Sequence, residues 1–476
     1  MQIIIDLKMS KLINNKYPRS LSTLFFTEMW ERFSYYGMRA LLVLYLVNSL
    51  NYSESDALHI YAVYTGLVYL TPLIGGYLAD RFLGTQKSIF IGGLTMMIGH
   101  FLMAFPDYLY LAIGMLIIGN GYFKPNISSL LGRLYKSNDL RRDSGFSIFY
   151  VGINLGAFLA PLIVGYVGET INWHYGFAIA GFGMLAGLIQ FYYGQNKIIK
   201  EDITLQSKKL KLADWGLISI ISIINIPLIL LILEVNQVLN NYFFEILLAL
   251  ITLISFYLLS RKKQLISAKE DLKKIIYIGV LSIFVIFFWV GFEQAGGSLT
   301  LFANNSVDRN FLGFIIPASF FQSINPLIII LIGPMIANFW LRVDRSKNNI
   351  NTPQKMGLGL LLLAGGFFLI TLVNTASDTS ISLWWLVGVY FLHTLGELCL
   401  SPIGLSMVSK VSPKKIASLM MGFWFLSSAV ANFMAGKLPG ILQSNNLDLF
   451  SFLMVTSLIA GLLLLLISTF MEKLVK

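Results

Sequence analysis

The chain has 476 residues, of which 56% are hydrophobic and only 12% are charged, and it carries 40 glycines. Soluble domains have about twice that share of charged residues, so the composition excludes a soluble enzyme and a disordered chain. A single cysteine and four scattered histidines exclude a disulfide framework and a multi-cysteine metal site. A net charge of +11 in so apolar a chain is typical of a membrane protein with basic cytoplasmic loops.

Fourteen stretches are long and apolar enough to cross a membrane, because a spanning helix needs about 20 mostly apolar residues. In chain order they are residues 19–50, 57–79, 86–104, 109–131, 143–166, 174–194, 212–234, 241–260, 273–302, 311–337, 353–373, 383–408, 414–437 and 449–471. The sequence therefore predicts an all-α integral membrane protein with about 14 transmembrane helices. The pair at 212–260 could instead form one re-entrant hairpin.

Lysine and arginine predict the orientation of these spans. If residue 1 is inside the cell, thirty of the 35 basic residues lie on inner segments and two, Arg309 and Lys437, lie in outer loops. The other three lie within spans. One missed or invented span would reverse every later loop. We therefore expect an even number of spans, both termini in the cytoplasm, and a multi-pass location in the plasma (inner) membrane.

A loop signature follows the second span. Residues 75–87 read GGYLADRFLGTQK and resemble the loop signature of the major facilitator superfamily. In this loop motif, formed by Gly76, Asp80 and Arg81, the carboxylate can cap a helix end and the guanidinium can face an anionic leaflet. A weaker echo, GPMIANFWLR at 333–342, is expected in the loop after the tenth span. For the echo, ordinary helix-end chemistry is an equally good explanation.

Paired signatures imply two six-helix halves with a binding site between them. We divide the chain into an N-terminal half (1–196), basic linkers with an inserted helix pair (197–272), and a C-terminal half (273–476). The predicted architecture is thus a major facilitator fold with an inserted helix pair.

The first span carries charges, which are costly inside a membrane and indicate function. Its ionisable and phenolic side chains recur at spacings of three and four, so they share one helix face. They are Glu28, Glu31, Arg32, Tyr35, Tyr36 and Arg39. Such a face cannot contact lipid and is expected to line a water-filled cavity. A buried structural ion-pair cluster is the alternative.

Six motifs resemble the proton-dependent oligopeptide transporter family. In chain order they are E-x-x-E-R-F-x-Y-Y-G in the first span, IGNGYFKPNISSLLG (118–132), FYVGINLGAFLAP (149–161), FWVGFEQAGGSLTLFA (288–303), FQSINPL (321–327) and GELCLSPIGLSMVSKV (396–411). The resemblance covers both halves. The inserted helix pair is also typical of the prokaryotic members.

This resemblance implies a proton-coupled symporter that imports di- and tripeptides by alternating access, with protons as the coupling ion and no cofactor. It implies proton coupling by Glu28, Glu31, Arg32 and Glu293, the last paired with Arg39. It also implies that Arg39 and Lys124 face the cargo carboxylate and that Glu397 receives the amino group. The other implied binding residues are Tyr35, Tyr36, Tyr69, Tyr150, Asn154, Trp289, Glu293, Asn325, Ser401 and Trp424.

One departure concerns the second span, where the animal members carry a histidine. Residues 61–72 contain none, so coupling would depend on carboxylates. Taken singly, Trp289 and Trp424 could be packing residues, and Lys124 could be a structural lysine whose ammonium reaches the membrane surface.

A pocket that binds only the two termini of a peptide would accept any sequence, and apolar walls would adapt to the side chains. The alternatives are a family relative that carries an amino acid, nitrate or a peptide-like drug, and a peptide sensor that does not transport. No set of nucleophile, base and orienting residue and no metal motif is present, so an enzyme is not expected. Beyond peptides, protons and the lipid bilayer, we expect neither nucleic acid nor an obligate protein partner.

Overall fold

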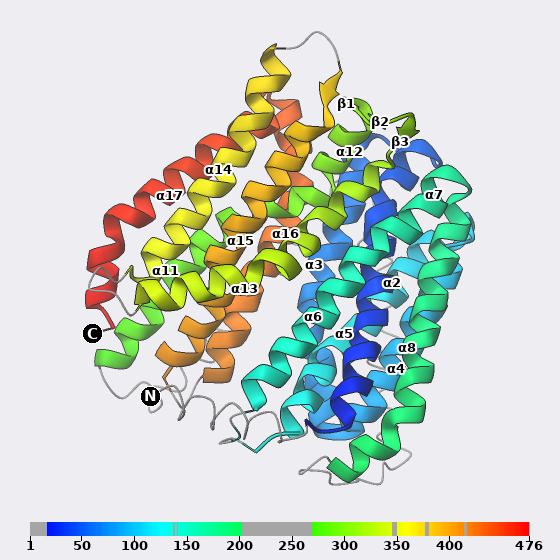
Figure 1. Cartoon of the computed structure of the whole chain (residues 1–476), viewed down its shortest axis with the longest axis vertical. Helices are drawn as coiled ribbons and strands as arrows, with labels where there is room; N and C mark the ends of the chain where they lie inside the picture. Colours follow the sequence, from blue (N-terminus) through cyan, green and yellow to red (C-terminus); the bar gives the residue numbers. More distant parts are fainter. Residues whose placement is uncertain are drawn as a thin grey trace, which may run out of the picture.

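The structure, a computed structural model, is a bundle of long helices and describes residues 17–136, 139, 141–201, 269–344, 350–376, 380–413 and 417–475 (Figure 1). The long helices of the N-terminal part are α2 (Ser20–Asn48), α3 (Glu54–Leu78), α4 (Thr85–Leu102), α5 (Leu109–Arg133), α6 (Arg142–Ala160) and α8 (Trp173–Glu201). Those of the C-terminal part are α11 (Lys269–Phe292), α13 (Ile324–Asp344), α14 (Thr352–Ala376), α15 (Leu383–Val411), α16 (Ala417–Ser444) and α17 (Leu449–Lys473).

Twelve of the fourteen expected spans fall on described residues, and a long helix lies at each of them. The other two, 212–234 and 241–260, lie outside the described residues with most of the insert. Nine described segments pass as membrane spans by length and composition alone. The remaining long helices, α2, α4 and α5, have 29, 18 and 25 residues. α2 is similar in length to those nine segments, but it carries the ionisable residues of the first span, which lower its apolar character.

Two of the expected spans are interrupted where their sequence disfavours a continuous helix. At Pro161 α6 passes into the π-helical segment η3 (Pro161–Gly165) and then α7 (Tyr166–Thr170). α11 gives way to the 3₁₀ segment η4 (Glu293–Gly296), followed by α12 (Ser298–Asn305). Gly296, the last residue of η4, and Gly297, which precedes α12, form this bend. A Cβ atom at Gly296 would collide with the Tyr61 hydroxyl, so only glycine permits this approach.

The span expected at 311–337 begins too early. Its first residues form a hairpin of β2 (Asn310–Phe311) and β3 (Phe314–Ile315), which turns through Leu312 and Gly313 with positive φ. The Asn310 side chain accepts a hydrogen bond from the Gly313 N–H at 3.0 Å, which stabilises this turn. The 3₁₀ segment η5 (Ala318–Ser323) then leads into α13.

Three short segments complete the described elements. The 3₁₀ segment η2 (Pro106–Tyr108) precedes α5. The strands β1 (Val307–Asp308) and β4 (Ile381–Ser382) pair in parallel, so they join the end of α12 to the start of α15. These contacts lie at the upper end of Figure 1.

Both loop signatures are helical in the structure, so the expectation of loops is wrong. Asp80 and Arg81 lie in the π-helical segment η1 (Ala79–Leu83), and only Gly84, with φ of 76°, separates it from α4. The Asp80 carboxylate lies 3.9 Å from Arg133 and caps no helix. Gly76 faces Pro125, and a Cβ atom at this position would make an ordinary van der Waals contact with the proline ring. The echo at 333–342 is part of α13.

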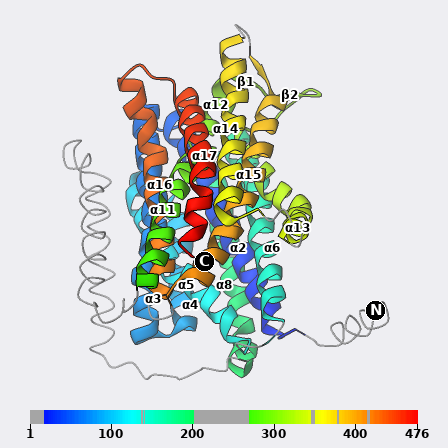
Figure 2. The same cartoon turned by 90° about the vertical axis from the view of Figure 1, so that its left-hand side faces the viewer.

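The long helices pack in two groups. In one, α2 packs against α6 and α8, while α5 packs against α3 and α4. In the other, α14 packs against α15 and α17, and α11 packs against α16 and α17. The groups meet chiefly where α3 lies against α16 and α6 against α13 (Figures 1 and 2). The first group lies between Ser20 and Glu201 and the second between Lys269 and Lys473, and the division of the chain at 1–196, 197–272 and 273–476 stays a prediction.

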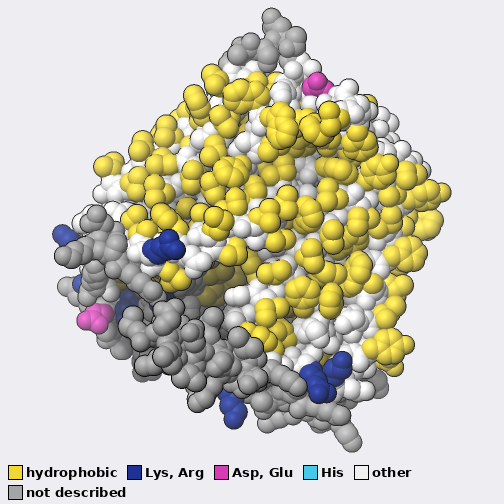
Figure 3. All heavy atoms as spheres, viewed as in Figure 1, with side chains coloured by type: hydrophobic (Ala, Val, Ile, Leu, Met, Phe, Trp, Pro, Cys, Tyr) yellow, Lys and Arg dark blue, Asp and Glu magenta, His cyan; other side chains and the backbone are white. Residues whose placement is uncertain are grey.

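The outer surface has the polarity of a membrane protein. Hydrophobic side chains cover the broad middle of the face in Figure 3, while Lys and Arg side chains lie in its lower part. Large apolar side chains of the described helices are strongly exposed, for example Leu466 on α17 at 80% and Tyr193 on α8 at 77%. Such an extended apolar surface requires lipid around it. The chain is therefore a multi-pass membrane protein.

Candidate binding cavity

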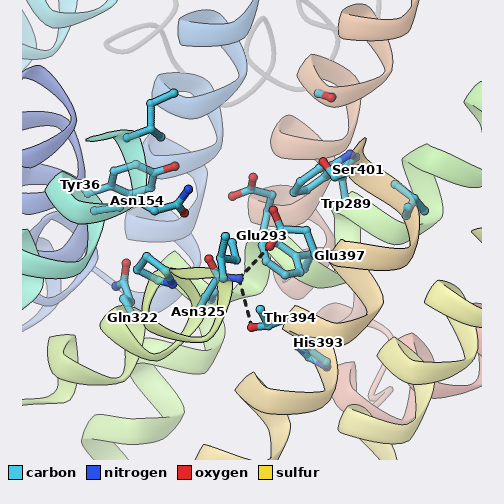
Figure 4. A pocket seen from close by; sticks show the side chains of 18 of the residues that line it. Tyr36, Asn154, Trp289, Glu293, Gln322, Asn325, His393, Thr394, Glu397 and Ser401 are labelled. Carbon is cyan, nitrogen blue, oxygen red and sulfur yellow. Dashed lines mark hydrogen bonds between the residues drawn. The ribbon is translucent and has the colours of Figure 1, made fainter. Parts of the chain in front are cut away.

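A cavity of about 240 Å³ lies between the two groups of helices. Helices α2, α3 and α6 supply one wall, while α11, α13, α15 and α16 supply most of the other. Most of the predicted binding residues line it: Tyr36, Arg39, Tyr69, Tyr150, Asn154, Trp289, Glu293, Asn325, Glu397, Ser401 and Trp424. Figure 4 shows Tyr36 and Asn154 on one side and Trp289 and Glu397 on the other.

An ion pair joins the two helix groups beside this cavity. The Arg39 guanidinium on α2 donates from Nη2 to Glu293 Oε2 at 2.5 Å and from Nε to the Tyr61 hydroxyl at 2.6 Å. The pair expected between Arg39 and Glu293 is therefore present. Both side chains are less than 10% exposed. The bend after α11 makes this contact possible, because Glu293 is the first residue of η4.

Glu397 supplies a carboxylate on the opposite wall. Asn325 Nδ2 donates to Glu397 Oε2 at 2.7 Å and to Thr394 Oγ1 at 3.1 Å (Figure 4). The amide thus fixes the orientation of the carboxylate. Among the described residues, no basic side chain forms an ion pair with Glu397. A partly buried carboxylate without a cationic partner is suited to bind a positively charged group.

A second charged cluster lies in the N-terminal group, and we call Glu28, Glu31, Arg32 and Asn120 the α2 cluster. Arg32 Nε lies 3.2 Å from Glu28 Oε1 and also contacts the Glu31 carboxylate. Asn120 Nδ2 donates to Glu31 Oε1 at 3.4 Å. All four residues are buried, with at most 3% exposure. None lines the cavity, so the cluster is suited to hold a proton rather than the cargo.

Two predicted binding residues do not line the cavity. The Tyr35 ring packs 6.1 Å from the ring of Tyr64, because successive residues on a helix point about 100° apart and Tyr36 takes the cavity side. The Lys124 ammonium lies 4.3 Å from the centre of the Tyr69 ring. Since Tyr69 lines the cavity, Lys124 lies directly behind the cavity wall.

Sequence reasoning missed several polar lining residues, which are Gln322, Tyr390, His393, Thr394 and Ser428. Helical spacing gives a signal for two of them. Thr394 precedes Glu397 by three positions, and Gln322 precedes Asn325 by three, so each shares a helix face with a predicted residue.

Contacts between the two helix groups gather at the end opposite the basic surface. Glu169 of α7 accepts hydrogen bonds from the backbone N–H groups of Ala318 and Ser319 at 2.7 and 2.9 Å. Asn305 Nδ2 donates to Glu54 Oε1 at 3.0 Å. A Cβ atom at Gly436 would collide with α3, which shows how closely α16 approaches α3. These contacts close that end of the bundle.

The chain matches known transporters over nearly its whole length. A model of the POT family matches residues 86–452. A peptide transporter of Yersinia enterocolitica is 34% identical, over 91% of this chain and 89% of that protein. A di-/tripeptide transporter of Lactococcus lactis is 35% identical, over 94% of this chain and 95% of that protein. An uncharacterised transporter of Bacillus subtilis is 36% identical, over 97% of this chain and 95% of that protein.

Solved structures agree with these relatives. A mutant of a peptide transporter POT in complex with alafosfalin is 36% identical and superposes with a TM-score of 0.86, covering 96% of both chains. A POT family transporter in complex with a thioalcohol-conjugated peptide is 32% identical, with a TM-score of 0.86 over 96% of this chain and 97% of the other. The protein is thus a membrane transporter of the major facilitator fold. The chain belongs to the POT family.

Proposed function

We propose that the protein is a proton-coupled symporter that imports di- and tripeptides. The observation that supports this most directly is the position of Glu397 and Arg39, which line one cavity from opposite helix groups. A short peptide carries an ammonium and a carboxylate, and these two side chains have the complementary charges. The peptide transporters named above support the same cargo.

Each terminus has its own set of groups. The ammonium would bind Glu397, whose carboxylate is oriented by Asn325. The carboxylate would bind the donors that Arg39 does not use toward Glu293 and Tyr61. Lys124, behind the Tyr69 ring of the cavity wall, would add a second positive charge on that side. Trp289 and Trp424 supply apolar walls for the side chains of the peptide, which permits varied sequences.

Alternating access would use the contacts between the helix groups as a switch. The Arg39–Glu293 pair and the Glu169 contacts join the groups at and beyond the cavity. Protonation of a carboxylate or binding of a peptide would weaken them, so proton and cargo could bias the same two-state equilibrium. We propose that the transported proton is the only coupling ion and that the protein needs no cofactor and catalyses no chemical reaction.

Uptake into proteoliposomes tests the proposal. We expect a labelled dipeptide to accumulate when the lumen is more alkaline than the outside and the membrane potential is negative inside. One proton provides about 2.3 kcal/mol per 100 mV and about 1.4 kcal/mol per pH unit, which together sustain roughly 500-fold accumulation. A protonophore should abolish accumulation. Uptake that does not depend on the proton gradient would contradict proton symport. Failure to bind any di- or tripeptide would contradict the assignment of peptides as the cargo.

We also propose that both termini lie in the cytoplasm of the cell and that the membrane is the plasma membrane. A cysteine introduced near residue 205 is expected to react with an impermeant maleimide only after the cells are permeabilised, because positive loops stay inside. A cysteine at Leu312, which is 92% exposed on the β2–β3 turn, should react in intact cells. The reverse pattern would contradict this orientation.

A further inference from the structure

A second cavity, of about 430 Å³, lies on the other side of α15 from the binding cavity. The second half of α13, the first turn of α14 and the last turns of α15 enclose it, so it lies at the basic end of the bundle. On α15, Glu397 and Ser401 face the binding cavity whereas Leu398 and Pro402 face the second one. The two cavities are therefore separate sites.

Two lysines line this cavity, and one is in an unusual position. Lys355 is only 7% exposed and its ammonium lies 5.0 Å from the centre of the Trp340 ring. It occupies the first turn of α14, which contains no acidic residue. A helix N-terminus is itself positive, so Lys355 adds its charge to a positive helix end. Lys410, in the last turn of α15, adds a second cation.

Neutral donors complete the polar part of the cavity. The indole N–H of Trp340 is buried and has no acceptor among the described residues. A buried donor without an acceptor is costly, so a ligand that offers an oxygen would gain a hydrogen bond there. Ser406 also lines the cavity and carries a hydroxyl that can donate a hydrogen bond. Cations and donors together match an anionic group that is rich in oxygen, such as a phosphate.

The rest of the cavity is apolar and continues onto a lipid-facing surface. Leu398 and Met407 form part of its wall. On α13, Leu341 lines the cavity at 54% exposure, and Met335 nearby is 68% exposed. Figure 2 shows α13 at the edge of the bundle. A ligand with a phosphate and an acyl chain would satisfy both parts, whereas free phosphate would satisfy only the first.

We propose that this cavity binds an anionic glycerophospholipid of the cytoplasmic leaflet, with its phosphate between Lys355 and Lys410 and an acyl chain along α13. Basic pockets between membrane helices on the cytoplasmic side are suited to such headgroups. The choice of leaflet rests on the orientation proposed above. A bound lipid would fix the tilt of α13, whose N-terminal end carries Asn325 of the binding cavity.

Native mass spectrometry of the full-length transporter tests this site without measuring transport. Phosphatidylglycerol and phosphatidylcholine with the same acyl chains are titrated into the detergent-solubilised protein. We expect preferential binding of phosphatidylglycerol to the wild type. Each lysine near an anionic headgroup contributes about a fivefold gain in affinity, so Lys355→Gln with Lys410→Gln should weaken binding by roughly 25-fold. Trp340→Phe, which keeps the ring but removes the N–H, should cause a smaller loss.

The matched control is Lys273→Gln with Lys473→Gln, which removes the same charge from exposed positions on α11 and α17. It should retain the lipid. Equal losses in both double variants would assign binding to general surface charge and overturn the proposal. Competition by millimolar inorganic phosphate would instead identify a site for free anions and overturn the lipid assignment. If the double variant does not fold, Lys410→Gln alone, at an exposed position, should still show a loss of about fivefold.

Discussion

Glu31→Gln is expected to abolish gradient-driven peptide uptake while exchange of labelled for unlabelled peptide partly survives. The variant removes the carboxylate of the α2 cluster that contacts both Arg32 and Asn120. Glutamine keeps the shape but cannot take up a proton. Because the cluster lies outside the cavity, the affinity for peptide should change little. Exchange needs no net movement of protons, so it can continue in the variant.

Glu28→Gln should have the same effect to a smaller degree. Glu28 contacts Arg32 at 3.2 Å, and its other oxygen has no hydrogen-bond partner in the described part of the chain, whereas Glu31 has a second partner in Asn120. Protonation of either carboxylate would release Arg32 to form other contacts, which makes the cluster a two-state element that a proton gradient can bias. Loss of one partner from a buried ion pair is costly, so the variants must first be shown to fold by their thermal unfolding temperature.

Glu270→Gln is the control for these variants. Glu270 is an exposed carboxylate in the first turn of α11, outside the cavity and outside the contacts between the helix groups. Driven uptake and exchange should both stay near the wild-type rates. If Glu31→Gln loses exchange together with driven uptake and still binds peptide, the cluster is a conformational gate and not the coupling site.

The periodicity of charged residues predicted that the first span carries its ionisable groups on one face, because the cost of placing charge in a membrane is local and can be read from one helix. The expectation that this whole face lines a water-filled cavity was wrong: Tyr36 and Arg39 line the cavity, whereas Glu28, Glu31 and Arg32 form a buried cluster, the alternative that the sequence left open. The positive charge of the inner loops likewise follows from local composition. The residues expected to bind the two termini of the peptide, by contrast, came from the resemblance to a family and not from spacing.

Interactions between distant segments could not be predicted from the sequence. Asn325 and Glu397 are 72 positions apart, and the hydrogen bond from Arg39 to the Tyr61 hydroxyl joins α2 to α3. Which neighbour of a charged residue faces the cavity depends on small rotations of packed helices, so Tyr36 lines it and Tyr35 does not. The hairpin of β2 and β3 contains the exposed apolar residues Phe311, Leu312, Phe314 and Ile315. Composition alone therefore predicts a membrane helix there, although the structure has a hairpin.

Glu397→Gln is expected to raise the apparent KM for dipeptides with a free amino group by about 10- to 100-fold, because a charged hydrogen bond is worth about 1.5–3 kcal/mol. Peptides whose amino group is acetylated carry no ammonium, so their inhibition constants should change little. The preference for a free amino group would thus largely disappear. Competition against a labelled dipeptide in proteoliposomes measures both classes under the same conditions.

Glu397 is a sharper test than Arg39, because Arg39→Ala would also leave Glu293 buried without its partner and could inactivate the protein. Glutamine at 397 can still accept the hydrogen bond from Asn325, so the cavity wall should keep its geometry. Asn325→Ala is the matched variant: it keeps the charge of Glu397 but releases its orientation, and it should cause a smaller loss with the preference retained. Equal losses for free and acetylated peptides in Glu397→Gln would show that Glu397 does not bind the amino group.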